Sequence, residues 1–306
     1  MDIPQLPQED PPADFTTDTT FISGGQTLNR YSAWIALIHC LATSAFQDWN
    51  ARQYRLDCTS APRVSIKVVG NPRPGDPPLL VKHIMWSLLA VARFWESPSG
   101  GPSYADTNFE PKVAAQRLGR GKVFSTGIGT SSSSAGDDNN DDASRIALPA
   151  AVYNQSTTRT STSPLFSSSL SSLANLTQDE VKLEIPFDLT TPVLCTPSEF
   201  YIILMQAIVK LGTKGPREPS IGVRYYYAPK DMTFEIGATS AAAAQDLTQY
   251  KIVFALETLA EFMYAQSPEK RFHGFVGRWK WNDRIVGRVN MFRGRAPGGD
   301  GWDDVD

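Results

Sequence analysis

The residues best suited to chemistry gather near the end of the chain, in residues 270–295. This segment carries eight basic residues and one acid, interleaved with aromatic residues. A two-residue turn at Asn282-Asp283 predicts a β-hairpin. Simple pairing about that turn places five side chains on one face: Phe275, Trp279, Trp281, Arg284 and Arg288. Such a face suits an anionic or aromatic ligand or a protein partner. The structural alternative is a set of cross-strand aromatic pairs covered by arginine stems.

Three side chains are candidates for a single general acid or base, namely His83, Tyr225 and Tyr227. Proton transfer needs only one positioned group. These residues therefore keep open a cofactor-independent lyase, isomerase or cyclase with a pocket between two halves of the chain. The structural alternative for His83 is a surface residue in the first turn of a helix. His39 is expected in a helix core, and His273 on the surface.

Motifs for other chemistry are missing from the sequence. There is no nucleophile elbow, complete phosphate loop or kinase signature, and Gly119-Arg120-Gly121-Lys122 is interpreted as a hairpin turn. No histidines have ligand spacing and no C-x-x-C occurs, so we expect neither metal nor cofactor. Three cysteines cannot build a disulfide framework, and Cys40 is expected to be a buried free thiol.

Composition limits the class of protein. Hydrophobic residues make up 41% and charged residues 20% of the 306 residues, which is typical of a globular protein. A net charge of −3 argues against nucleic acid as a partner. Residues 1–20 do not resemble a signal peptide, and no apolar run is long enough to span a membrane. We expect a cytoplasmic protein, or a secreted one only if this is a mature form.

The elements that position these residues occur twice along the chain. Residues 15–126 and 183–292 can be superposed at an offset near 168. For example, Ser65-Ile66-Lys67-Val68 matches Thr233-Phe234-Glu235-Ile236. Each half is predicted as β-α-β-β-α-β(β), with two helices on one face of an antiparallel sheet. The fold class is therefore α+β with an internal duplication.

Helix signals support this order. Asn29 is a candidate N-cap for a helix to about Trp49, and Thr196-Pro197-Ser198-Glu199 predicts the start of the corresponding helix. The element order is that of a split β-α-β arrangement. We expect the two units to pack sheet against sheet as an intramolecular pseudo-dimer, with a ligand cleft between them.

Five segments follow from these patterns. They are a disordered lead-in (1–14), a first α+β repeat (15–127), a Ser/Thr/Asp-rich flexible linker (128–180), a second repeat (181–295) and an acidic tail (296–306).

The sequence favours a non-enzymatic binding or interaction protein built from two repeats. An acid–base enzyme that uses His83, Tyr225 or Tyr227 is one alternative. The Ser/Thr-rich insertion suggests another, a eukaryotic (fungal-type) effector acting on a host protein.

Overall fold

The structure is a computed structural model of the whole chain. It describes residues 11–60, 63–71, 75–97, 103–126, 181–186, 193–227, 230–245, 247–266 and 272–294. The expectations for the linker (128–180), the tail (296–306) and residues 1–10 lie outside the described residues.

The first half forms an antiparallel sheet with two helices on one face. Its elements are β1 (Phe15–Phe21), α1 (Arg30–Ala45), β2 (Arg55–Ser60), β3 (Val64–Gly70), α2 (Val81–Trp95), β4 (Thr107–Val113), β5 (Gln116–Arg117) and β6 (Gly119–Ser125). The strand order is β1-β4-β6-β3-β2, and β5 pairs with β4. Residues 119–122 lie inside β6, so the hairpin turn predicted there is wrong.

The second half repeats this layout. Its elements are β7 (Val181–Glu184), α3 (Pro197–Gly212), β8 (Gly222–Tyr227), β9 (Met232–Ala238), α4 (Ala241–Gln245), α5 (Gln249–Ala265), β10 (Phe275–Trp281) and β11 (Arg284–Arg293). The strand order is β7-β10-β11-β9-β8. The two orders correspond strand by strand, and the α+β class is confirmed, with two long helices on each sheet and the short α4 added in the second half. A common origin of the halves stays a prediction.

The split β-α-β arrangement is wrong for both sheets. In the first sheet the β4–β6 pair lies between β1 and β3, and in the second the β10–β11 pair lies between β7 and β9. Every neighbouring pair of strands is therefore antiparallel. The extra strand is β6 in the first unit and β11 in the second. It returns the chain to the middle of the sheet and so makes this order possible.

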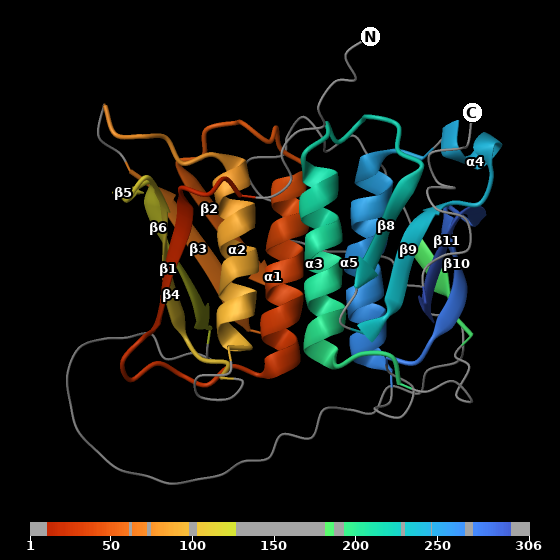
Figure 1. Ribbon diagram of the computed structural model, residues 1–306, viewed down its shortest axis with the longest axis horizontal. Helices are drawn as coiled ribbons and strands as arrows, with labels where there is room; N and C mark the ends of the chain where they lie inside the picture. Colours follow the sequence, from red (N-terminus) through yellow and green to blue (C-terminus); the bar gives the residue numbers. More distant parts are fainter. Residues whose placement is uncertain are drawn as a thin grey trace, which may run out of the picture.

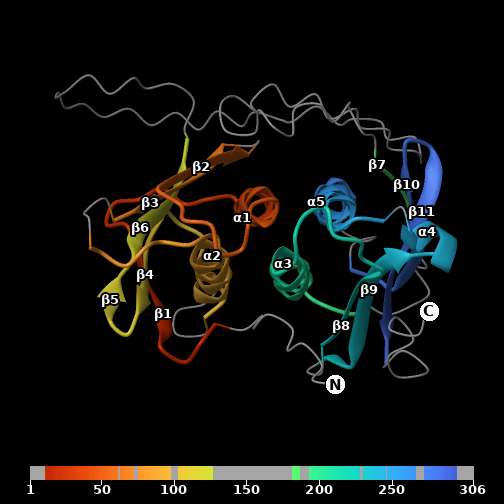
Figure 2. The ribbon, with the colours of Figure 1, turned by 90° about the horizontal axis from the view of Figure 1, so that it is seen from above.

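The molecule has four layers, in the order sheet, helices, helices, sheet (Figures 1 and 2). The expected packing of sheet against sheet is wrong. Each sheet covers its apolar face with its own helices, and the helix pairs then pack on each other. Twelve of the sixteen residues of α1 are buried, as expected for a helix that is apolar on nearly every side.

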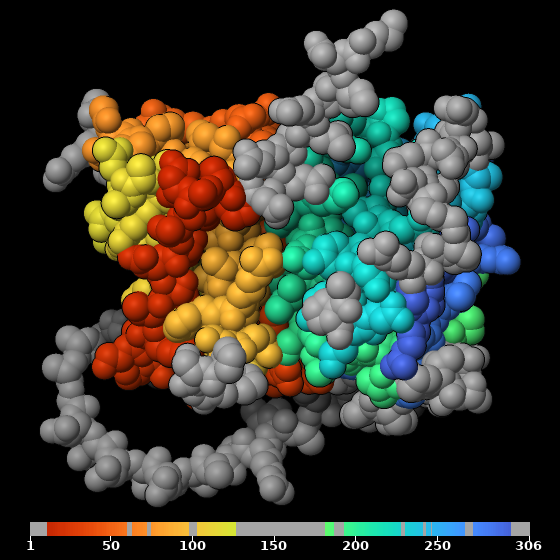
Figure 3. Space-filling model, in the orientation of Figure 1, coloured from red at the N-terminus to blue at the C-terminus, as the bar shows by residue number. Residues whose placement is uncertain are grey.

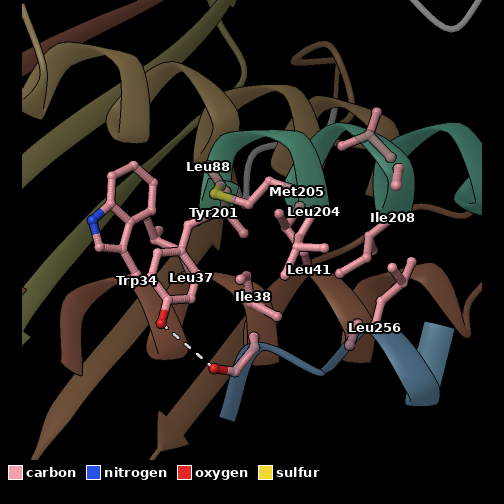
Figure 4. Close-up of a cluster of buried hydrophobic side chains, with 14 of the residues drawn as sticks. Trp34, Leu37, Ile38, Leu41, Leu88, Tyr201, Leu204, Met205, Ile208 and Leu256 are labelled. Atoms are coloured by element: carbon pink, nitrogen blue, oxygen red, sulfur yellow. Dashed lines mark hydrogen bonds between the residues drawn. The ribbon is translucent and has the colours of Figure 1, made fainter. Parts of the chain in front are cut away.

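The interface between the halves is continuous and apolar. Figure 4 shows side chains of α1, α2, α3 and α5 in one cluster, and in Figure 3 the orange atoms of α2 lie directly against green atoms of the second half. Trp34 of α1 stacks on Tyr201 of α3 with ring centroids 5.9 Å apart, and the Tyr201 hydroxyl donates to the carbonyl of Ala260. α1 and α3 run parallel, since Arg30 contacts Ser198 at their starts and Ala45 lies beside Gly212 at their ends.

Each sheet contains a glycine covered by an aromatic ring. A Cβ on Gly121 of β6 would lie 2.1 Å from Cζ of Phe109, its neighbour on β4. A Cβ on Gly287 of β11 would lie 1.8 Å from Nε1 of Trp279 on β10. Only glycine allows the ring to lie this close to the backbone. The two rings thereby fill corresponding places beneath the helices.

The expectation that Cys40 is a free thiol is wrong. Cys40 of α1 forms a disulfide with Cys58 of β2, with the two Cα atoms 5.5 Å apart. The alternation of β2 directs Cys58 toward the helices, where α1 presents Cys40. Cys195 is a buried free cysteine. Among the described residues, no helix is both long and apolar enough to cross a membrane.

Candidate ligand pocket at the start of two helices

A pocket of about 450 Å³ opens where the two halves meet. Tyr31 of α1 contributes from the first half. The remaining lining residues come from three segments of the second half: Val193, Leu194, Cys195, Thr196, Pro197, Lys230 and Phe272. The pocket thus lies beside the amino-terminal ends of α1 and α3, the ends that carry the positive pole of a helix dipole.

Local sequence fixes the start of both helices. The Asn29 side chain accepts hydrogen bonds from the amides of Tyr31 and Ser32, which confirms it as the N-cap of α1. Thr196 caps α3 through its side chain, and Glu199 accepts from the Thr196 amide at 2.8 Å. This reciprocal capping box orients the pocket residues Thr196 and Pro197.

A polar cluster next to these helix starts joins the halves. Arg30 donates from Nε to the Tyr104 hydroxyl at 3.0 Å and from Nη2 to Ser198 of α3. Its guanidinium lies 3.6 Å from Glu96, which also accepts a hydrogen bond from Tyr104. The cluster holds α1 and α3 in a fixed relation at the end where the pocket opens.

Phe272 forms one wall of the pocket in a strained backbone conformation. Its φ of 65° lies in the left-handed region, which is costly for a bulky residue. Its carbonyl accepts from the Leu194 amide at 2.9 Å, and its ring packs on Phe200 with centroids 5.4 Å apart. These contacts hold the strained residue in place.

The polar groups at the pocket are poorly suited to proton transfer. Burial, and then the charge of Glu199, raises the pKa of the Cys195 thiol to about 12. Burial, together with Glu199, Tyr225 and Cys195, raises the pKa of Tyr227. Both groups therefore stay neutral near pH 7. The ammonium of Lys230 lies 3.7 Å from Glu199, a contact that is too long for a strong hydrogen bond.

The predicted hairpin is present, but its five candidate residues do not share a face. Asn282 and Asp283 form the turn with φ values of 48° and 63°. A register shift between Trp279 and Lys280 then places Arg288 opposite Arg278 instead of Gly277. Phe275, Trp279 and Trp281 are buried under the helices. Arg288 lies on the outer face, 3.8 Å from Glu235, and Arg284 is exposed beside the turn.

The expectation that His83 is a surface residue is wrong. His83 is 8% exposed, and its ring stacks on Phe15 with centroids 5.7 Å apart. Its Nδ1 accepts from the Leu80 amide at 3.2 Å, which completes the cap of α2. Burial, with a smaller contribution from Lys82, lowers the pKa of His83 to about 4. The side chain does not line the pocket.

The tyrosine candidates lie closer to the pocket residues. Tyr225 and Tyr227 are half-buried on the helix-facing side of β8, in line with buried Val223. Neither tyrosine lines the pocket, although Cys195 and Glu199 lie close enough to Tyr227 to help raise its pKa.

His39 connects the two halves. Its Nδ1 lies 2.6 Å from Oε1 of Glu257 on α5. Burial alone would lower the pKa of His39, but the hydrogen bond to Glu257, with the charges of Glu257 and Glu261, raises it above its ordinary value. His273, expected at the surface, is half-buried and bridges to Val193.

Within the described residues, no cluster of histidine, cysteine and acidic side chains is arranged to hold a metal ion. Comparisons with protein-family models, curated proteins and solved structures find no match.

The sequence did not indicate Lys230, Val193 or Phe272. They come from three separate segments that meet only in the folded chain, so no local spacing connects them. The one local signal is the helix start at Thr196, which predicts an N-cap but does not indicate a ligand site.

Proposed function

We propose that the protein is a non-enzymatic binding protein whose pocket takes a small ligand with an aromatic or apolar body and an anionic group. The observation that carries this proposal is the pocket of about 450 Å³ at the boundary between the halves. That volume lies in the range of small-molecule sites, which are mostly apolar with a few polar groups.

The lining supports this class of ligand. Tyr31 and Phe272 offer aromatic surface, and Val193 is an apolar side chain that is 56% exposed. Lys230 is the cation of the pocket, and the start of α3 favours negative charge nearby. An anion would compete with Glu199 for the Lys230 ammonium, whose present contact is long at 3.7 Å.

The chemistry of the neighbouring groups favours binding over catalysis. A general base works best with a pKa near the operating pH, whereas the pKa values of Cys195 and Tyr227 are raised. His83 serves the cap of α2, away from the pocket lining. The enzyme alternative therefore has less support among the described residues.

The sequence and the disulfide favour different cellular compartments for this binding protein. The sequence favours the cytoplasm, whereas a Cys40–Cys58 disulfide favours an oxidising compartment, where such bonds persist.

Anilinonaphthalene sulfonate, an anionic aromatic fluorophore, tests the pocket by titration. Removing one charged contact costs about 1–2 kcal/mol, so we expect Lys230→Gln to weaken binding roughly 5- to 30-fold. Val193→Asp should weaken it further, by placing a like charge at the apolar wall.

Lys210→Gln is the matched control, because this exposed lysine lies in the last turn of the same helix α3. It should leave the affinity unchanged. Equal affinity of wild type, Lys230→Gln and Val193→Asp would place the fluorophore elsewhere and refute the proposal.

A further inference from the structure

The outer face of the first sheet carries three cations that form no ion pair with another described residue. Lys67 of β3 and Arg120 and Lys122 of β6 are exposed on the side of the sheet that faces away from α1 and α2. We call these three cations, together with Phe124, the basic face. The basic face shares no residue with the pocket, so a ligand bound here is independent of the function proposed for the pocket.

The pairing of the other charges on this sheet makes the basic face distinctive. Lys112 pairs with Asp18, Arg117 with Glu110 at 3.3 Å, and Arg55 with Asp57 at 2.5 Å. Among the described residues, Lys67, Arg120 and Lys122 have no acidic partner within 4 Å. On the two central strands the three cations form no such pair, although Asp57, which pairs with Arg55, lies opposite Lys67 across β2 and β3.

The strand register places Asp57 of β2 on one side of Lys67 and Lys122 of β6 on the other. Lys67 and Lys122 lie directly opposite each other on β3 and β6. Like charges in that relation are destabilising. The corresponding position in the second sheet shows the neutralised arrangement, since Glu235 lies opposite Asn290 on β9 and β11 and also pairs with Arg224 at 3.0 Å.

An aromatic ring lies among these cations. The ammonium groups of Lys122 and Lys67 lie 4.5 and 5.5 Å from the centroid of the Phe124 ring. Val69, which is 41% exposed, lies opposite Arg120. Cations around an aromatic ring on an open surface are the combination that binds single-stranded nucleic acid, where phosphates meet the cations and a base stacks on the ring.

We propose that the basic face binds single-stranded nucleic acid through its phosphates and one stacked base. An acidic peptide would form only exposed ion pairs here, which contribute little. A polyphosphate chain also releases condensed counterions and so gains affinity from the same charges. The net charge of −3 for the whole chain does not oppose this, because charges more than about 8 Å away are largely screened at physiological salt.

The test is fluorescence anisotropy of the full chain with labelled oligothymidylate and oligouridylate, each on the order of ten nucleotides. Both should bind within a few-fold of each other, because no described contact selects the sugar. We expect the three cations to neutralise three phosphates. A plot of the logarithm of the association constant against the logarithm of the salt concentration should then have a slope of about −2.

Two variants separate the contributions. Lys67→Gln combined with Lys122→Gln should weaken binding at least about tenfold and reduce the salt slope to about −0.7, since one cation remains. Phe124→Leu should weaken binding about tenfold without changing the slope, because it removes only stacking.

The control is Lys112→Gln combined with Arg117→Gln, which removes the same charge from cations that already have partners. It should change the affinity less than about threefold. The lysine pair variant should keep the melting temperature close to that of the wild type, because it removes both the repulsion between the lysines and the attraction of Lys67 to Asp57 opposite it.

Four outcomes would overturn the proposal. They are the absence of binding at low salt, an equal loss in the control variant, tighter binding of a duplex than of a single strand, and binding of polyglutamate or anionic vesicles with no effect of Phe124→Leu.

Discussion

At the scale of single residues, burial decides what the histidines do. His83 was a candidate base because of its residue type, yet it lies against Phe15 and caps α2. The cap requires an unprotonated Nδ1, and burial disfavours the charged ring. We therefore expect protonation of His83 to destabilise the fold.

The lowered pKa of His83 predicts acid lability. The unfolded chain takes up a proton below about pH 6.5, whereas folded His83 resists protonation until about pH 4. Stability is therefore unaffected above pH 6.5 and falls as the pH drops from 6.5 to 4, by roughly 2–4 kcal/mol. Denaturant unfolding between pH 4 and 7 measures this loss, and His83→Gln should reduce it.

His39 provides a contrast of opposite sign. Its raised pKa gives stability that is present below its ordinary pKa of 6.5 and lost as the pH rises through the folded pKa. His39→Gln should therefore deepen the loss toward acid. If His39→Gln and His83→Gln changed the loss of stability between pH 6.5 and 4 in the same direction, the lowered pKa of His83 would be wrong.

At the scale of elements, local sequence signals were sufficient for the helices and most strands. Asn29 and Thr196 act as N-caps as expected. The register of β10 and β11 could not be predicted, because a bulge leaves no mark in an alternating pattern. That single shift moves Arg288 to the face opposite Trp279.

The close approach of Phe109 to Gly121 makes a prediction about the first sheet. Gly121→Ala would place a methyl group 2.1 Å from the ring, so we expect a loss of about 1–3 kcal/mol in the free energy of unfolding. Phe109→Leu should partly restore the stability of the alanine variant. Asn108→Ala, at an exposed neighbouring position, is the control.

Thermal and denaturant unfolding of the wild type, the two single variants Gly121→Ala and Phe109→Leu, and the double variant measure the coupling between the two positions. Additive effects of Gly121→Ala and Phe109→Leu would contradict direct contact, since independent sites add.

At the scale of the whole molecule, the sequence indicated two similar units but not how they meet. The expected sheet-to-sheet contact failed because α1 is apolar on nearly all sides, so it needs cover both from its sheet and from α3. The pocket could not be predicted from the sequence either, because its lining residues meet only when the two halves pack on each other.

The buried interface predicts that both halves unfold together. Leu204→Ala on α3 should cost about 2–5 kcal/mol, and native-state hydrogen exchange should show this loss in β3 as well as in β9. Val276→Ala, at a position 68% exposed, should affect neither strand. Unchanged protection of β3 in Leu204→Ala would mean that the halves open independently.

The order of the four layers has a geometric consequence for binding partners. With helices in the centre, the exterior surfaces of the two sheets point in opposite directions (Figure 2). A molecule bound to one exterior would therefore lie on the far side of the chain from a molecule bound to the other, with four helices between them.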